Sequence, residues 1–103
     1  MADPSIQPRT IEEANRLTQL YQRRHELVNK LNESRLSLTL IRETMSRLTG
    51  NEGWVLVETL NCLIANVTEN IGLTQELMSY VESEIYHILD DIEEYNRLTG
   101  AEE

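Results

Sequence analysis

The clearest feature of the sequence is the spacing of its apolar residues, which recur at alternating intervals of three and four over two long segments. In the first segment eight of the ten positions are apolar: Leu17, Leu20, Arg24, Leu27, Leu31, Ser34, Leu38, Ile41, Met45 and Leu48. In the second segment ten of the twelve are aliphatic or methionine: Val57, Leu60, Ile64, Val67, Ile71, Thr74, Met78, Val81, Ile85, Ile88, Ile92 and Tyr95. We call these sets the first and second seam. Such a sustained 3.5-residue repeat predicts two helices with coiled-coil packing.

Local signals place the ends of the first helix, which we expect over about residues 11–49. Thr10 can cap its free amides, and Glu13 at the third helical position can reach back to them. A basic last turn followed by Gly50 is typical of a helix end. Residues 1–9 contain both prolines and no apolar period, and we expect them to form a flexible tail.

The turn is expected at residues 50–53, followed by a second helix over about residues 54–99. Asn51 can cap this helix, with Glu52 in its first turn. Gly72 marks a weak point or kink, since glycine costs about 1 kcal/mol relative to alanine in a helix. The repeat nevertheless passes through it without a phase shift.

A four-residue turn makes the two helices antiparallel neighbours. The predicted fold is therefore all-α, a long coiled-coil-like two-helix hairpin that associates into a four-helix or larger bundle. Residues 10–50 carry a net charge of +2 and residues 51–103 a net charge of −11, which favours their pairing. Arg16, beside the first seam, is expected near Glu84.

Several large apolar residues lie outside both seams, mostly toward the turn. We expect them to form a partner or oligomer interface, since a contiguous exposed apolar patch usually marks one. The alternative is a third or fourth helix within the chain, with breaks near residues 32–34 or Gly72. The interface is expected at Leu36, Leu40, Trp54, Leu56, Leu63, Leu73 and Leu77; Leu89 lies farther along the second helix.

Composition narrows the classes of function. The chain has 103 residues and a net charge of −9, which argues against binding to nucleic acid or to an anionic membrane. Its single cysteine, Cys62, fits a reducing compartment, so we expect a cytoplasmic protein. No phosphate loop, zinc spacing or catalytic triad is recognisable, and we expect neither enzyme activity nor a cofactor.

Two polar clusters are weaker candidates for a site. Tyr21, Arg23, Arg24 and Lys30 combine basic and aromatic residues and could bind an anionic ligand between protomers. Arg24 is the one charge in the first seam, and its ordinary partner would be Glu76 or Glu82. Glu84 and His87 have the Glu-x-x-His spacing of di-iron bundles, but a solvated polar face is the expected reading.

Acidic residues crowd the end of the second helix at Asp90, Asp91, Glu93 and Glu94. Such a face ordinarily aids solubility. The functional alternative is a small inhibitor of the kind phages use, which would occupy a basic protein surface by mimicking nucleic-acid charge.

Tyr86-His87-Ile88-Leu89-Asp90 and Tyr80-Val81-Glu82-Ser83-Glu84 follow a Tyr-x-x-x-Asp/Glu pattern near the end of the second helix. In this the chain resembles the small helical hairpins secreted by type VII systems, which carry such a pattern as an export signal. Gly53-Trp54 at the turn departs from their Trp-x-Gly order, and Leu56 stands in place of the glycine. The resemblance implies a secreted hairpin as a third hypothesis. The first remains an oligomerising scaffold or adaptor that binds itself or a helical partner.

Overall fold

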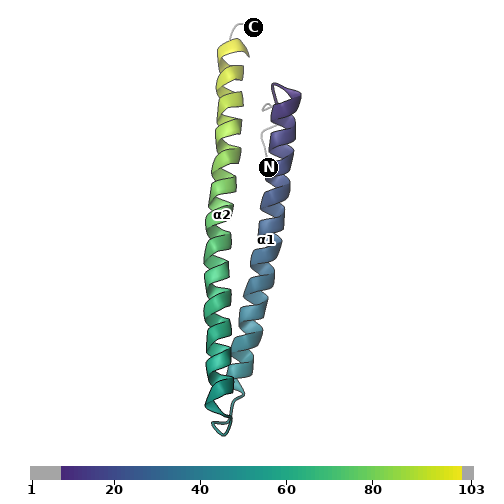
Figure 1. Ribbon diagram of the computed structural model, residues 1–103. Coiled ribbons are helices and arrows are strands. Elements are labelled where there is room, and N and C mark those ends of the chain that lie inside the picture. Colours follow the sequence, from purple (N-terminus) through teal and green to yellow (C-terminus); the bar gives the residue numbers. More distant parts are fainter. Residues whose placement is uncertain (1–7, 101–103) are drawn as a thin grey trace. The chain divides into compact units, whose positions relative to one another are not determined.

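The computed structural model describes residues 8–100, and these form two long helices joined by a turn (Figure 1). Helix α1 spans Ile11–Ser46 and helix α2 spans Trp54–Gly100. The predicted all-α helical hairpin is confirmed. Residues 1–7 of the predicted tail lie outside the described residues. Neither helix contains a stretch long and apolar enough to cross a membrane.

The hairpin divides into two compact units, each with residues from both helices. The turn unit comprises Leu27–Leu77, and therefore the end of α1, the turn and the first half of α2. The terminal unit comprises, among the described residues, 8–26 from α1 and 78–100 from α2. Each unit is described below by itself.

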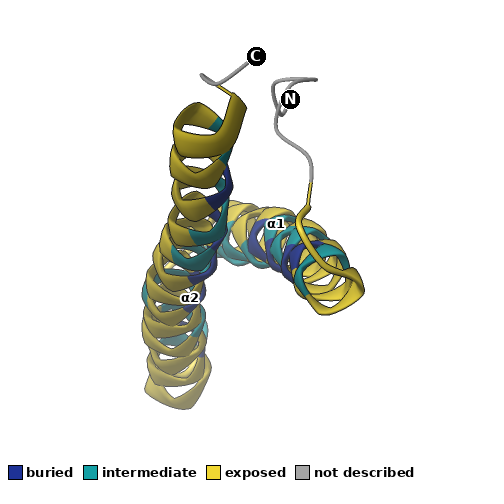
Figure 2. Cartoon of the chain, turned by 90° about the horizontal axis from the view of Figure 1, so that it is seen from above, coloured by how far each residue is buried: buried dark blue, intermediate teal, exposed yellow. Residues whose placement is uncertain are grey.

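The two predicted seams form the core of both units. Every seam position is buried or half-buried except Tyr95, which is exposed. In the terminal unit the buried residues include Leu17, Leu20, Val81, Ile85 and Ile92, and in the turn unit Leu27, Leu31 and Leu60. Buried and half-buried positions lie mainly on the sides of the helices that face one another, and the outer sides are mainly exposed (Figure 2). The heptad repeat therefore identified the core correctly.

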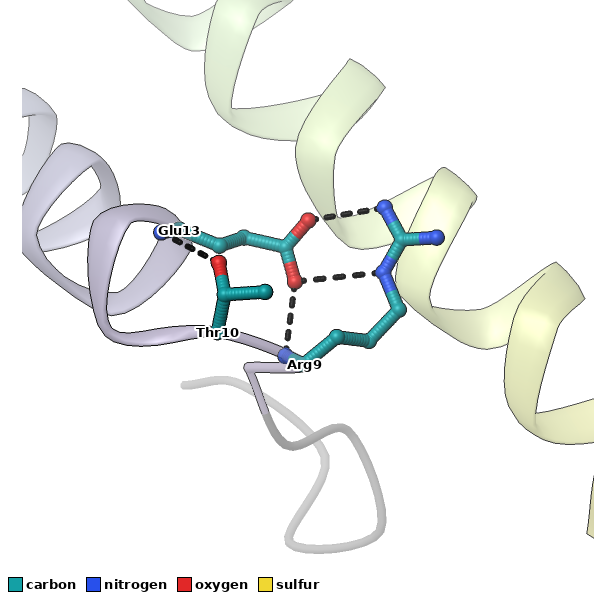
Figure 3. Close-up of polar contacts among 3 residues, drawn as sticks. All are labelled: Arg9, Thr10 and Glu13. Atoms are coloured by element: carbon teal, nitrogen blue, oxygen red, sulfur yellow. Dashed lines mark hydrogen bonds and ion pairs between the residues drawn. The ribbon is translucent and has the colours of Figure 1, made fainter.

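The start of α1 is fixed by the residues that the sequence indicated (Figure 3). The backbone N–H of Glu13 donates to Thr10 Oγ1 at 3.0 Å, so Thr10 is the N-cap. The Glu13 carboxylate reaches back one residue farther than in a standard capping box, and accepts the Arg9 backbone N–H at 2.7 Å. It also accepts the Arg9 guanidinium, with Nη2 2.8 Å from Oε2. These bonds, the one from the Arg9 side chain first, hold the pKa of the Glu13 carboxyl below its usual range.

The expected end of α1 needs a correction, because the helix stops at Ser46 rather than near residue 49. Beyond it the backbone tightens, with Arg47 N–H donating to Thr44 O and Leu48 N–H to Met45 O, both at 3.1 Å. Such three-residue spacing is common at helix ends. Gly50 then adopts a φ of +89°, the left-handed conformation that favours glycine.

Glu52 closes the turn, which the sequence did not predict. Its carboxylate accepts the backbone N–H groups of Thr49 and Gly50 at 3.0 Å and the Thr49 hydroxyl at 3.1 Å. These bonds, led by the Thr49 amide, lower the pKa of the Glu52 carboxyl. Because α2 begins only at Trp54, the expectation that Asn51 caps it with Glu52 in its first turn is wrong.

Neither helix is interrupted at the positions that intrachain closure requires. Helix α1 continues through residues 32–34, and α2 continues through Gly72. Residues 8–100 therefore contain no third helix to cover the apolar residues outside the seams.

Candidate interaction surface

The apolar residues predicted to form an interface are all exposed, and all belong to the turn unit. Their exposed fractions run from 43% for Leu63 to 74% for Trp54. We call this set the leucine flank: Leu36, Leu40, Trp54, Leu56, Leu63, Leu73 and Leu77. Val55, at 58% exposed, lies beside it and was missed because a lone valine near a helix start gives no periodic signal. Leu89, in the terminal unit, is half-buried and does not belong to the flank.

The flank on α2 occupies a face adjacent to the seam. Leu56, Leu63 and Leu77 each directly precede a seam residue, namely Val57, Ile64 and Met78. One residue turns a helix by about 100°, so these leucines lie at the edge of the face that packs on α1. The contrast is sharp for two leucines on one helix: Leu60 is 8% exposed and Leu63 is 43% exposed. Burying a leucine is worth about 1.5–3 kcal/mol, which is the driving force that this surface offers to a partner.

The opposite edge of α2 in the turn unit is mainly polar, in contrast to the edge that carries the three leucines. Asn61, Thr68 and Gln75 are exposed there, at heptad spacing. Apart from Trp54, which shares the heptad position of these polar residues, the flank residues of α2 lie away from this edge, as an interface requires and a uniformly solvated helix does not.

The basic-aromatic cluster is brought together only in part. Within the terminal unit, the Arg24 guanidinium lies over the Tyr21 ring, with Cζ 5.1 Å from its centroid. Arg24 therefore stacks on an aromatic ring one turn away, and within the described part of the terminal unit it forms no ion pair with Glu82. Arg23 pairs with Glu26, Nη1 to Oε2 at 3.4 Å. Lys30 is exposed in the turn unit.

The ion pair that the hairpin register predicted is present in the terminal unit. Arg16 Nη2 lies 3.7 Å from Glu84 Oε2. It links α1 to α2 at the position that the seams require. Glu84 is therefore engaged by an arginine, and residues 8–100 contain no group of three His, Cys, Asp or Glu side chains that could hold a metal ion. His87 is exposed.

The four acidic residues near the end of α2 are all exposed. Glu94 makes a long contact with Arg97, Oε1 to Nη2 at 3.8 Å, which is worth little at the surface. Asp91 lies close enough to Arg9 to raise the pKa of that guanidinium, although the Glu13 hydrogen bond contributes more. The Arg9 guanidinium also lies over the Tyr95 ring, 5.3 Å from its centroid.

Tyr86 and Asp90, the residues of the Tyr-x-x-x-Asp pattern, lie one turn apart on the outer face of α2. Both line a shallow, open depression together with Ser79, Glu82, Ser83 and His87. All six side chains come from a single helix and all are exposed, so the depression is a feature of the helix surface and not an enclosed pocket. Cys62 is also exposed, with a free thiol.

Comparison with known protein families, with curated proteins and with solved structures gives no match.

Proposed function

We propose that this protein is a non-enzymatic helical interaction module, which oligomerises as a scaffold or adaptor subunit through its leucine flank. The observation that supports the proposal best is that the residues expected at an interface from the sequence are the ones exposed in the structure. All seven residues expected at an interface are exposed, and all lie in one unit of the chain.

The energetics favour association over a solvated flank. Each residue of the flank leaves 43–74% of its surface in water, and two helices alone cannot cover it. Monomeric proteins rarely expose contiguous apolar patches of this kind without a binding role. Further copies of the chain, which carry the same apolar surface, would remove these side chains from water.

The proposal is tested by measuring the mass of the protein by light scattering on a sizing column, over a wide concentration range. The wild type is expected to be a dimer or larger closed assembly. Leu63→Glu and Leu77→Glu should each weaken the assembly about tenfold or more, because each would bury an unpaired carboxylate at the interface, and a tenfold change needs only about 1.4 kcal/mol. Circular dichroism should show unchanged helicity, since both residues lie outside the seams.

Gln75→Glu is the matched control, because it adds the same charge on the opposite, polar edge of α2. It should leave the mass unchanged. A wild type that stays monomeric at the highest concentration, or Leu63→Glu and Leu77→Glu variants that both keep the parental mass, would overturn the proposal.

A further inference from the structure

We propose that the occupant of the flank is a second copy of the chain, which packs α2 against α2 in antiparallel orientation about a two-fold axis between Asn66 and Asn70. This inference rests on the proposed function and gives it a partner, an orientation and a register. It is carried by a second heptad pattern on the exposed face of α2.

The second pattern runs beside the buried seam over residues 56–77. Steps of three and four residues lead from Leu56 to Thr59 and Leu63. They continue through Asn66 and Asn70 to Leu73 and Leu77, and all seven residues are exposed. We call this set the outer seam. The turn half of α2 therefore carries two heptad seams on neighbouring faces, one filled by α1 and one open to water, which is the pattern of a helix within a four-helix bundle.

The outer seam contains no charge. The carboxylates in this part of α2, at Glu58, Glu69 and Glu76, occupy other heptad positions. In a chain of net charge −9, an uncharged stripe over six helical turns keeps carboxylates out of the layer in which two identical surfaces meet. A basic or acidic partner would find no complementary group on it.

The spacing of the outer seam is self-complementary. From Thr59 to Leu77 its steps are four, three, four, three and four, which read the same in both directions. An antiparallel copy centred near residue 68 therefore sets Leu63 against Leu73 and Asn66 against Asn70, and each pair recurs across the two-fold axis. Such a surface, on which residue i meets j and j meets i, is the requirement for a symmetric dimer.

The two asparagines supply specificity at the centre of this arrangement. A carboxamide both donates and accepts hydrogen bonds, so Asn66 of one copy and Asn70 of the other can satisfy each other. Buried asparagines at seam positions fix register and oligomeric state in coiled coils. The leucine layers on either side would shield these hydrogen bonds from water.

The distribution of charge selects the antiparallel orientation. The acidic residues Asp90, Asp91, Glu93 and Glu94 follow the outer seam on the same helix. Parallel pairing would align the acidic ends of two copies side by side, whereas antiparallel pairing directs them to opposite ends of the dimer.

The experiment measures distances between spin labels in the full-length protein by pulsed electron resonance. Labels are placed singly at Val55, Cys62, Glu69 and Glu76, which share one heptad position outside the second seam and the outer seam. Cys62 is labelled directly. Val55, Glu69 and Glu76 are each changed to cysteine in a Cys62→Ser background. At ~1.5 Å rise per residue, the two copies of each label are separated along the axis by about 39, 18, 3 and 24 Å respectively. The lateral spacing of the helices adds a similar amount at every site.

A V-shaped series with its minimum at Glu69 is the expected result, and Leu63→Glu in each labelled protein should abolish the dipolar signal. Equal distances at all four sites mean a parallel pair, and a minimum elsewhere means another register; either overturns the inference while the proposed function stands. A dipolar signal that Leu63→Glu abolishes, but whose distances do not form the V-shaped series, likewise overturns the inference and leaves the proposed function standing. A protein that is monomeric by mass overturns both.

Discussion

At the scale of single residues, two glutamates fix the two ends of α1 by the same means. Glu13 accepts the Arg9 amide ahead of the helix, and Glu52 accepts the Thr49 and Gly50 amides behind it. Each carboxylate thereby satisfies backbone donors that lie just outside the helix. For both groups the folded-state pKa is lowered, so the stabilisation exists above the ordinary glutamate range and is lost as the pH falls through the folded value.

Glu52→Gln is therefore expected to lower the thermal midpoint by a few degrees at pH 7, because the neutral amide accepts the three turn donors less strongly. The difference from the wild type should shrink as the pH falls below the ordinary glutamate range and through the lowered pKa of Glu52, where the carboxylate of the folded protein becomes protonated. Thermal unfolding followed by circular dichroism between pH 7 and pH 3 measures this.

Glu58→Gln is the control, since Glu58 is exposed within α2 and outside the turn. It should leave the midpoint nearly unchanged. A Glu52→Gln deficit that persists unchanged at pH 3 would show that the charge of the carboxylate does not hold the turn.

At the scale of elements, the sequence predicted the features that depend on the heptad period and on local helix capping. The seams, the N-cap at Thr10, the glycine after α1 and the exposed flank all follow from spacing along a helix. The Glu52 bonds and the early end of α1 could not be predicted, because they depend on how the backbone bends after the last helical turn. The sequence grouped Tyr21 with Arg24, but it did not predict that the guanidinium stacks on the ring, because that depends on the rotamers of the two side chains.

Two glycines provide a matched test of how backbone conformation acts on each element. A Cβ built at Gly72 or at Gly50 has no other atom within 4 Å, so neither substitution to alanine creates a clash. Gly72 lies inside α2, and Gly72→Ala should raise the free energy of unfolding by about 0.5–1 kcal/mol. Gly50 has a φ of +89°, and Gly50→Ala should lower it by about 1 kcal/mol or more.

Urea unfolding at one fixed protein concentration measures both changes. The mass of the Gly72→Ala assembly should equal that of the wild type, because residue 72 belongs to neither the second seam nor the outer seam of α2. A destabilised Gly72→Ala variant would mean that the helix is strained there or that another backbone approaches it closely.

At the scale of the whole molecule, the leucine flank and the crowded carboxylates at the end of α2 lie in different parts of the chain. The turn unit carries the entire leucine flank and a net charge of −2, from four basic and six acidic residues. The described part of the terminal unit has a net charge of −4, from five basic and nine acidic residues. Association and like-charge repulsion thus reside in different parts of the molecule, so each can be altered without the other.

This separation predicts the response to salt. Raising NaCl from 20 to 500 mM should raise the thermal midpoint, because screening relieves the repulsion among the crowded carboxylates of α2. The pairs of Arg23 with Glu26 and of Arg97 with Glu94, which salt also weakens, are exposed and contribute little. Asp90 and Glu93 are like charges one turn apart, so Asp90→Asn with Glu93→Gln should raise the low-salt midpoint by a few degrees and reduce the salt response.

Glu58→Gln with Glu69→Gln is the matched control, since it removes the same two charges from well-separated positions in the turn unit. If net charge alone governs stability, both double variants will shift the midpoint equally. If local crowding governs it, the Asp90 and Glu93 variant will shift it more, while the mass of both stays that of the wild type. A midpoint that falls with added salt would instead assign the charges a net stabilising role, through attractions such as that between Glu94 and Arg97.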